Sequence, residues 1–402
     1  MLKILQINAT VNWGSTGKIV EQINIDAASR GWNCFVAFGR HCNNSKSALL
    51  EVGNKFNVYS HFVESRLLDN EGLASRISTK NLIETIKEIQ PDIVHLHNIH
   101  DHWINYKILF QYLNTTDIPV VWTFHDFWAV TGHCAHFVSV NCNKWQYECG
   151  SCPLNESLID RSRRNFRLKK KLLLANKNLH IAAVSEWVAG LVKKSFLSNN
   201  DIRVIPNGIN LNVFRPRSKS EIAGMYDGKF IMMAVASQWK MGKGLNDYIE
   251  MSALLKDDEL IVLVGVDECT KKSLPDKIIG ISRINNQDEL ASLYSRADVV
   301  TSFSSAETFG LTIIEAFACG TPVVAYNNTA QATLVTSTTG YLVPTGDYKA
   351  AYQEIQTIRL KGKEYYSDTC LRLVAESYDE KLCSEKYINL YNDLLNQRKF
   401  VL

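Results

Sequence analysis

The sequence has no segment typical of a leader peptide or a membrane span. Its first residues carry neither the basic start nor the apolar stretch of a signal peptide, and no run of about 18 apolar residues occurs. The net charge is only +3 over 402 residues, which gives no general indication of nucleic-acid binding. Low-complexity tracts and short repeats are also absent, which excludes solenoids. These absences predict a globular cytoplasmic protein without a nucleic-acid partner.

What is present is a repeated alternation of short apolar runs with helical patterns. Continuous apolar runs bounded by turn residues are typical of buried strands in a parallel sheet, with helices as the connections. The first half of the chain is therefore predicted to form a Rossmann-like α/β domain. Its strands are expected at residues 3–9, 34–39, 92–97, 120–125 and 181–185.

The same alternation restarts after a stretch rich in turn residues, which begins with Pro206 and ends at Pro216. A second sheet is expected, and a C-terminal segment with apolar residues at helical spacing predicts a closing helix that packs back toward the first domain. We place the first domain at 1–206, a linker at 207–217, the second domain at 218–383 and the closing helix at 384–402. The second sheet is expected to use residues 230–236, 260–265, 277–281, 299–302, 322–326 and 341–343.

The segment from Ser304 to Ala325 has the most informative pattern. It predicts a strand, a loop, a helix, a turn and another strand, with Gly310 directly before the helix. A glycine there permits close backbone approach, and the free N–H groups at the start of a helix bind phosphates. Glu307 precedes this helix and Glu315 lies within it, so the two carboxylates can have separate tasks. Spacing alone leaves two readings open: a ligand site or two solvated surface glutamates.

The segment resembles the Glu-x7-Glu signature of glycosyltransferase family 4, including Phe309 and Gly310 after the first Glu and Gly-Thr-Pro-Val after the second. The stretches 204–210 and 214–216 are similar to the interdomain signature of that family, so the resemblance covers nearly the whole chain. It implies the GT-B fold, in which two Rossmann-like domains face each other across a cleft, and transfer from a nucleotide-sugar with retention at the anomeric carbon.

The resemblance also implies roles for residues of the first domain. Gly14 and Gly17, in the loop after the first strand, bring backbone close to the donor phosphate and acceptor. His125, at the end of a strand, contacts the transferred sugar, although a satisfied core histidine is the alternative. His97 and Asn98, at another strand end, line the acceptor side. The glycine loop does not fit the Gly-x4-Gly-Lys-Ser/Thr pattern, which disfavours a nucleotide triphosphatase.

In the second domain the resemblance assigns the donor diphosphate to basic side chains and backbone. Lys243 matches the lysine that the family uses, whereas Gln238 stands where arginine is common, and Lys240 is a candidate for the second charge. Phe309, Gly310 and Leu311 complete the donor-binding set with Glu315. The leaving diphosphate itself helps to deprotonate the acceptor hydroxyl, so His125, Glu307 and Lys243 position groups and stabilise charge. No Asp-x-Asp pair occurs, so catalysis is expected to need no metal cofactor.

Four cysteines lie within nineteen residues of the first domain. They are Cys134, Cys142, Cys149 and Cys152, of which the last two form Cys-x2-Cys. A structural zinc site is one reading, and free thiols or a redox-sensitive loop is the other, because the remaining spacings are irregular for the common zinc motifs. Four histidines at 95, 97, 100 and 102 also suggest a metal by count, but we expect them to line the acceptor side.

Between Arg161 and Lys171, seven of the eleven residues are Lys or Arg. This stretch predicts either a basic amphipathic helix that touches anionic lipid, which would place the protein peripherally on the inner face of the cytoplasmic membrane, or a solvated charged face.

The resemblance to glycosyltransferase family 4 implies a retaining hexosyltransferase that uses a UDP- or GDP-sugar and a glycan or lipid-linked acceptor in bacterial surface polysaccharide synthesis. The alternatives are a nucleotide-sugar epimerase of the same architecture and a catalytically silent sugar-nucleotide-binding protein.

Overall fold

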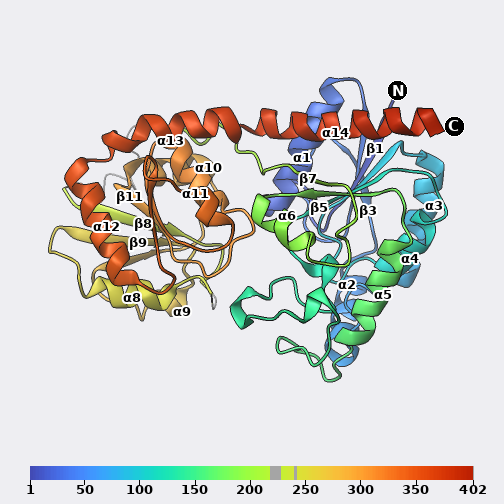
Figure 1. Ribbon diagram of the computed structural model, residues 1–402, viewed down its shortest axis with the longest axis horizontal. Helices are drawn as coiled ribbons and strands as arrows, with labels where there is room; N and C mark the ends of the chain where they lie inside the picture. The colour runs from blue at the N-terminus through green and yellow to red at the C-terminus, as the bar shows by residue number, and fades with distance from the viewer. Residues whose placement is uncertain (218–227, 240–241, 402) are drawn as a thin grey trace. The chain divides into compact units, whose positions relative to one another are not determined.

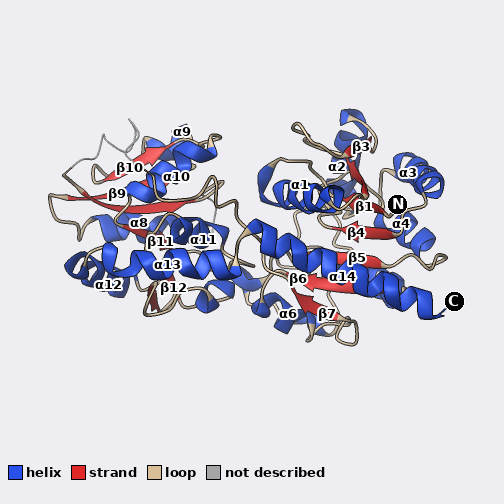
Figure 2. Cartoon of the chain, turned by 90° about the horizontal axis from the view of Figure 1, so that it is seen from above, coloured by secondary structure: helices blue, strands red, loops and turns tan. Residues whose placement is uncertain are grey.

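The structure is a computed structural model that describes residues 1–217, 228–239 and 242–401, with side chains described as far as 398. The chain divides into two compact units (Figure 1): residues 1–206 with 383–402, and residues 207–382. Each is built on one all-parallel sheet with helices on both faces (Figure 2). Within the described residues, no helix combines the length and apolarity that crossing a bilayer requires.

The first unit contains a seven-stranded sheet in the order β3-β2-β1-β4-β5-β6-β7. β4 and β5, near the centre of this sheet, are buried along their whole length, as their apolar runs predict, because helices cover both faces. The strands are β1 (Lys3–Ile7), β2 (Asn33–Phe38), β3 (Ala48–Glu51), β4 (Ile93–Leu96), β5 (Val120–Phe124), β6 (Leu179–Ala183) and β7 (Ile202–Val204). The helices are α1 (Gly14–Ser29), α2 (Lys55–Leu68), α3 (Arg76–Ile89), α4 (Tyr106–Leu113), α5 (Ser162–Leu174) and α6 (Glu186–Val192), with short 3₁₀ turns at Trp128–Val130, Val138–Val140 and Lys144–Gln146.

The second unit contains a six-stranded sheet in the order β10-β9-β8-β11-β12-β13. The predicted strands are all present, with ends shifted by no more than a residue or two. They are β8 (Phe230–Val235), β9 (Glu259–Val264), β10 (Ile278–Ile281), β11 (Val299–Ser302), β12 (Val323–Tyr326) and β13 (Gly340–Val343). The helices are α8 (Leu245–Ser252), α9 (Glu268–Lys271), α10 (Gln287–Arg296), α11 (Leu311–Ala318), α12 (Tyr348–Lys361) and α13 (Glu364–Ser377), with a 3₁₀ turn at Ala330–Thr333.

The last helix, α14 (Glu380–Val401), belongs to the first unit from Cys383 onward. Tyr387 and Tyr391 are buried against the first sheet, where the Tyr391 hydroxyl lies 2.6 Å from Nδ1 of His95 and the Tyr387 hydroxyl lies 3.0 Å from Oγ1 of Thr123. The predicted closing helix that packs back toward the first domain is confirmed.

Candidate active site

The strand orders locate the candidate site before any side chain is considered. In each sheet the order reverses at one point, between β1 and β4 in the first unit and between β8 and β11 in the second. Ligands of open parallel sheets bind outside the carboxyl ends of the strands at such a reversal. The loops that follow β8 and β11 carry Lys243 and Glu307, and the loops that follow β1 and β4 carry Gly14 and Asn98.

In the second unit, Lys243 and Glu307 form an ion pair across the reversal point. Lys243 Nζ lies 2.6 Å from Glu307 Oε1, and both side chains are partly accessible, at 37% and 22%. The two loops are also joined through their backbones, because the N–H of Ser305 donates to the carbonyl oxygen of Gly242 at 2.8 Å. Gly244 has φ +77°, and a Cβ there would lie 2.5 Å from the carbonyl oxygen of Phe303. The backbone therefore holds the lysine over the loop that carries the carboxylate.

The next feature is the start of α11. Gly310 is the N-cap with φ +97°, and among the described residues no side chain caps this helix. Its first N–H groups, beginning with Leu311, are donors available to an anion, and the helix dipole favours negative charge there. Phe309 is 4% exposed and packs edge-on against Tyr378, with ring centroids 5.8 Å apart. Its side chain therefore anchors the loop, and only its backbone can face a ligand.

Glu315 lies on the same helix and has a partner that the sequence did not suggest. Its Oε2 accepts a hydrogen bond of 2.8 Å from the hydroxyl of Tyr294, on α10. Burial, with the charge of Glu315, raises the pKa of Tyr294 well above its ordinary value, so the phenol stays protonated and remains a donor. Tyr294 fixes one oxygen of the carboxylate. The sequence gives no signal for this contact, because it joins two different helices, α10 and α11.

The remaining donor candidates lie near β8. Gln238 is exposed, so its side chain is accessible to a ligand. Lys240 lies outside the described residues, so its suggested part as the second charge stays a prediction.

In the first unit, the glycine loop begins α1. Gly14 has φ +65°, and Gly17 is buried where a Cβ would lie 2.8 Å from Oγ1 of Thr10. The N–H of Asn12 donates to the carbonyl oxygen of Gly17 at 3.1 Å, which closes the loop on itself. The loop can be this tight because Gly17 has no side chain, as the glycine pattern predicts.

His97 and His125 face each other at the ends of β4 and β5. His97 Nδ1 lies 3.1 Å from His125 Nε2, and His97 Nε2 lies 2.7 Å from Gln6 Oε1. The side-chain NH2 of Gln6 donates a hydrogen bond to the carbonyl oxygen of Val20, so the side-chain oxygen of Gln6 must accept a hydrogen bond from the Nε2–H of His97. His97 Nδ1 then accepts from His125, which leaves a lone pair on Nδ1 of His125.

Both imidazoles are neutral at ordinary pH. Burial lowers the pKa of His125 to about 4 and that of His97 well below its usual value. Burial alone would lower the pKa of the neighbouring His100 as well, but the charge of Asp126, 2.8 Å away, raises it well above the usual value. Although burial opposes the effect, His100 in turn lowers the pKa of Asp126 to about 2. The three histidines and Asp126 line one pocket of the first unit. The other lining residues are Asn98, Trp122, Thr123, Phe124, Trp128 and Ala129.

Among the described residues, His100 is the one member of the four histidines at 95, 97, 100 and 102 that belongs to a group able to hold a metal ion. His95 uses both ring nitrogens in the core, at 2.6 Å from the hydroxyl of Tyr391 and 2.7 Å from Oγ1 of Thr123. Within the described ranges, only Glu71, His100 and Asp101 bring three ligand atoms within 4.8 Å of one another. His97 and Asn98 therefore remain candidates for the acceptor side.

The four cysteines are free thiols in this structure. A hydrogen bond from the thiol of Cys134 lowers the pKa of Cys152 to about 6, so these two sulfurs are neighbours. Cys149 Sγ accepts the N–H of Gly132 at 3.3 Å. The four sulfurs, Cys142 included, do not converge on one point in the way that zinc ligands do. A structural zinc site stays a prediction.

Comparisons with known proteins agree with this arrangement. Residues 26–213 match the model of Glycosyltransferase Family 4, and residues 217–368 match that of Glycosyl transferases group 1. A protein of Escherichia coli K12 named as a colanic acid biosynthesis glycosyl transferase, WcaC, is 22% identical over 98% of this chain and its own whole length.

Two solved structures share the fold. Sucrose-phosphate synthase from Thermosynechococcus elongatus superposes with a TM-score of 0.73 at 18% identity, covering 99% of this chain and 100% of its own. Anabaena HepE in complex with UDP and glucose gives a TM-score of 0.68 at 16% identity, covering 98% and 100%. Given these matches and the two sheets described above, the chain belongs to the glycosyltransferases that combine a family 4 domain with a group 1 domain on the GT-B fold.

Proposed function

We propose that this glycosyltransferase is a retaining hexosyltransferase of the cytoplasm that serves bacterial surface polysaccharide synthesis. Its donor is a UDP- or GDP-linked hexose, and its acceptor is a glycan or a lipid-linked glycan. The relative named for colanic acid biosynthesis supports the polymer, and the Anabaena structure with UDP and glucose supports a nucleoside-diphosphate donor.

The Lys243–Glu307 ion pair at the start of α11 is the observation that carries this proposal. A diphosphate that binds at the N-terminus of the helix competes with Glu307 for the ammonium group, because charge-assisted bonds to phosphate are strong. The carboxylate of Glu307 is then released to accept hydrogen bonds from sugar hydroxyls. One side chain binds the leaving group and the other orients the sugar.

Catalysis in this proposal rests on positioning and on stabilisation of the leaving diphosphate. Lys243 and the N–H of Leu311 stabilise its developing charge, while a phosphate oxygen takes the proton of the acceptor hydroxyl. Nδ1 of His125 accepts a hydrogen bond from a sugar hydroxyl, and the carboxylate of Glu315 accepts hydrogen bonds from the ribose hydroxyls. The sequence has no Asp-x-Asp pair, so Lys243 replaces a metal ion as the counter-charge, and a chelator should leave activity unchanged.

A thermal-shift screen against UDP, GDP, ADP and their sugars tests the donor site, because a ligand that binds only the folded state raises the melting temperature. We expect one nucleotide family to stabilise the protein. Glu315→Ala should abolish this shift, and Lys243→Ala should lower kcat/KM for transfer about 100-fold. Lys349→Ala, an exposed lysine of the same unit, is the matched control and should change neither.

Two results would contradict the proposal. Stabilisation by no nucleotide would remove the donor site, and full conversion of a sugar nucleotide without any acceptor would show that transfer is not the reaction.

A further inference from the structure

Helix α2 has its apolar side turned outward. The only side chains that it buries are polar, those of His61 and Ser65. Phe56, Tyr59 and Leu67 are 75%, 66% and 46% exposed. These three lie on one face of the helix because their spacing approximates whole turns, and partly exposed Val63 falls between them. A surface helix of a soluble protein normally has the reverse arrangement.

The orientation of α2 is fixed by specific bonds. Asn54 and Asn57 form a reciprocal capping box at its N-terminus. On the buried side, His61 Nε2 accepts the N–H of Gly72 at 3.0 Å, and its Nδ1 lies 2.8 Å from the hydroxyl of Ser75. Rotating the helix to bury its apolar face would break these contacts. The exposed stripe is therefore built into the fold.

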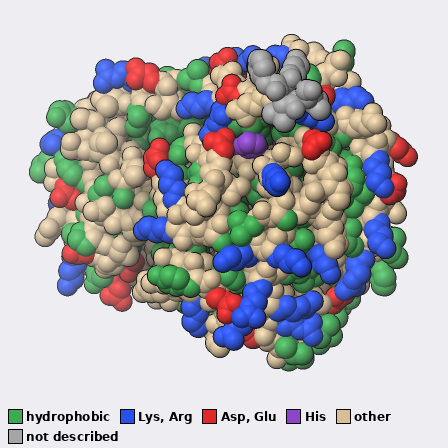
Figure 3. Space-filling model, turned by 45° about the vertical axis from the view of Figure 1, so that its right-hand side comes forward, with side chains coloured by type: hydrophobic (Ala, Val, Ile, Leu, Met, Phe, Trp, Pro, Cys, Tyr) green, Lys and Arg blue, Asp and Glu red, His purple; other side chains and the backbone are tan. Residues whose placement is uncertain are grey.

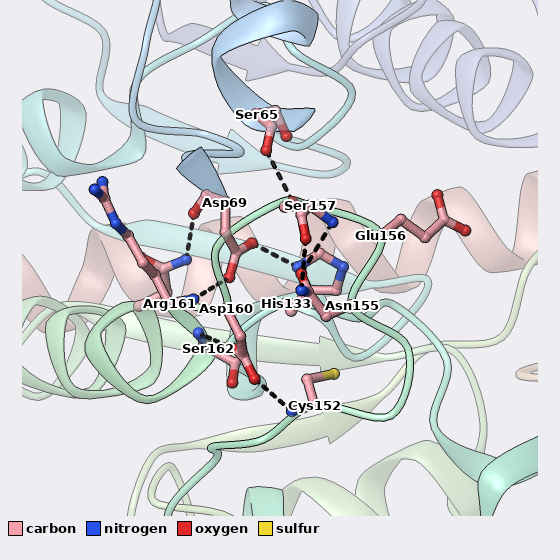
Figure 4. Close-up of polar contacts among 12 residues, drawn as sticks. Ser65, Asp69, His133, Cys152, Asn155, Glu156, Ser157, Asp160, Arg161 and Ser162 are labelled. Atoms are coloured by element: carbon pink, nitrogen blue, oxygen red, sulfur yellow. Dashed lines mark hydrogen bonds and ion pairs between the residues drawn. The ribbon is translucent and has the colours of Figure 1, made fainter. Parts of the chain in front are cut away.

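A loop extends the apolar surface beyond the end of α2. Leu158 is 81% exposed, and its N–H donates to the carbonyl oxygen of Arg66 at 3.0 Å. The hydroxyl of Ser157 donates to the carbonyl oxygen of Ser65 at 2.9 Å, as Figure 4 shows. The neighbouring Ile159 is 46% exposed. Leu158 and Ile159 therefore lie beside the C-terminal turn of α2, and with the four residues of the stripe they form what we call the apolar patch.

Basic side chains border this patch at the start of α5. The N–H of Arg161 donates to Oδ2 of Asp69, directly after α2, at 2.9 Å (Figure 4). The guanidinium of Arg164 lies 3.2 Å from Oδ1 of the next residue, Asn70. Figure 3 shows many Lys and Arg side chains gathered on the lower part of the face that it draws. The exposed basic residues of α5 are Arg163, Arg164, Arg167, Lys170 and Lys171.

Helix α5 supplies charge, but apart from the half-exposed Leu174 its apolar side is mainly turned inward. Phe166, Leu172 and Leu173 are buried in the first unit, and even Lys169 is buried, with Nζ 2.6 Å from the carbonyl oxygen of Trp128. The basic stretch therefore cannot insert an apolar side of its own into lipid, as the amphipathic interpretation of its sequence assumed. Insertion would have to come from the neighbouring patch.

We infer that the apolar patch and the exposed basic residues of α5 together form a docking surface for an anionic lipid bilayer. Apolar groups beside a cluster of cations match the boundary between acyl chains and anionic headgroups. A large exposed apolar patch on a monomer marks an interaction surface, and the adjoining positive charge selects anionic lipid over a neutral partner. The patch lies on the first unit and does not involve Lys243 or α11. Docking is therefore independent of the donor site.

Sedimentation with vesicles tests this inference on the full-length protein. The wild type should bind vesicles of phosphatidylcholine with phosphatidylglycerol and should bind pure phosphatidylcholine far less. Phe56→Ser/Tyr59→Ser and Lys170→Glu/Lys171→Glu should each weaken binding about tenfold or more. These side chains are exposed, so the variants should fold. Leu360→Ser/Tyr365→Ser, which removes two exposed apolar residues of the second unit, is the matched control.

The nucleotide thermal shift, measured in parallel, separates the two proposals: it should be the same in all these variants. Absence of vesicle binding by the wild type, or binding unchanged by Phe56→Ser/Tyr59→Ser, would overturn the inference. So would a dimer of the wild type that this double variant dissociates, because the patch would then be covered by a second copy of the chain.

Discussion

The two units share one architecture but differ in the chemistry of their polar groups. All ten histidines of the chain lie in the first unit, and residues 207–382 contain none. The candidate site of the first unit depends on neutral imidazoles such as His97 and His125, whereas that of the second depends on Lys243 and Glu307. Ammonium and carboxylate groups keep their charge across the physiological range, and imidazoles do not. Acid should therefore act on one unit and spare the other.

The largest predicted effect is that acidification lowers the free energy of unfolding of the first unit. Burial lowers the pKa of His61 to about 4, and that of His125 to about the same value. The unfolded chain binds protons near pH 6.5, whereas the folded chain does not until about pH 4. Stability is therefore full above pH 6.5 and falls as the pH drops through this window, by roughly 3 kcal/mol for His61 alone. His100, whose pKa is raised well above its usual value, acts in the opposite direction, because the folded chain holds its proton more tightly than the unfolded chain does.

Two probes can separate the units in this experiment. Seven of the eight tryptophans lie in the first unit, so their fluorescence during urea unfolding follows that unit. Amide hydrogen exchange in β8 and β11 follows the second. The fluorescence midpoint should fall between pH 6.5 and 4 while exchange in β8 and β11 changes little. An equal loss in both units would show that the histidines do not control the response.

A glycine substitution should have the complementary effect: it should destabilise the second unit and leave the first unchanged. Gly244→Ala places a Cβ 2.5 Å from the carbonyl oxygen of Phe303 at a position with φ +77°, and should cost about 3 kcal/mol. Gly346→Ala is the matched control, because it has φ +82° with no atom within 4 Å of the added Cβ, and should cost about 1 kcal/mol. Exchange in β8 measures both. Equal costs would mean that the loop carrying Lys243 relaxes freely.

In the first sheet the sequence predicted the centre better than the edges, whereas every strand of the second sheet was predicted. The central strands are continuous apolar runs, but β3 is largely exposed and β7 has only the three residues Ile202–Val204, so neither gives a buried-strand pattern. The loops that carry Lys243 and Glu307 contain glycines and were predicted. Their partners were not, because Gln6 and Tyr294 meet the site only through folding. The outward apolar face of α2 also required the structure, since periodicity shows a stripe but not its direction.

The smallest predicted effect tests whether α14, which follows the second unit in the chain, is energetically part of the first. The hydroxyl of Thr123 donates a hydrogen bond to the hydroxyl of Tyr387. The Nε2–H of His95 must therefore donate a hydrogen bond to Oγ1 of Thr123, and His95 Nδ1 accepts one from the hydroxyl of Tyr391. Tyr391→Phe leaves that nitrogen buried without a donor, which should cost about 1.5 kcal/mol.

Tryptophan fluorescence in urea measures this loss, because it follows the first unit. Tyr365→Phe, an exposed tyrosine of the second unit, is the control and should leave the midpoint unchanged. Faster amide exchange at Leu394 should accompany the loss of Tyr391, since both lie buried in one cluster with Ile4 and Val121. If Tyr391→Phe changed neither quantity, α14 would contribute nothing to the stability of the first unit through this bond. The helix would then no longer be counted as part of the first unit.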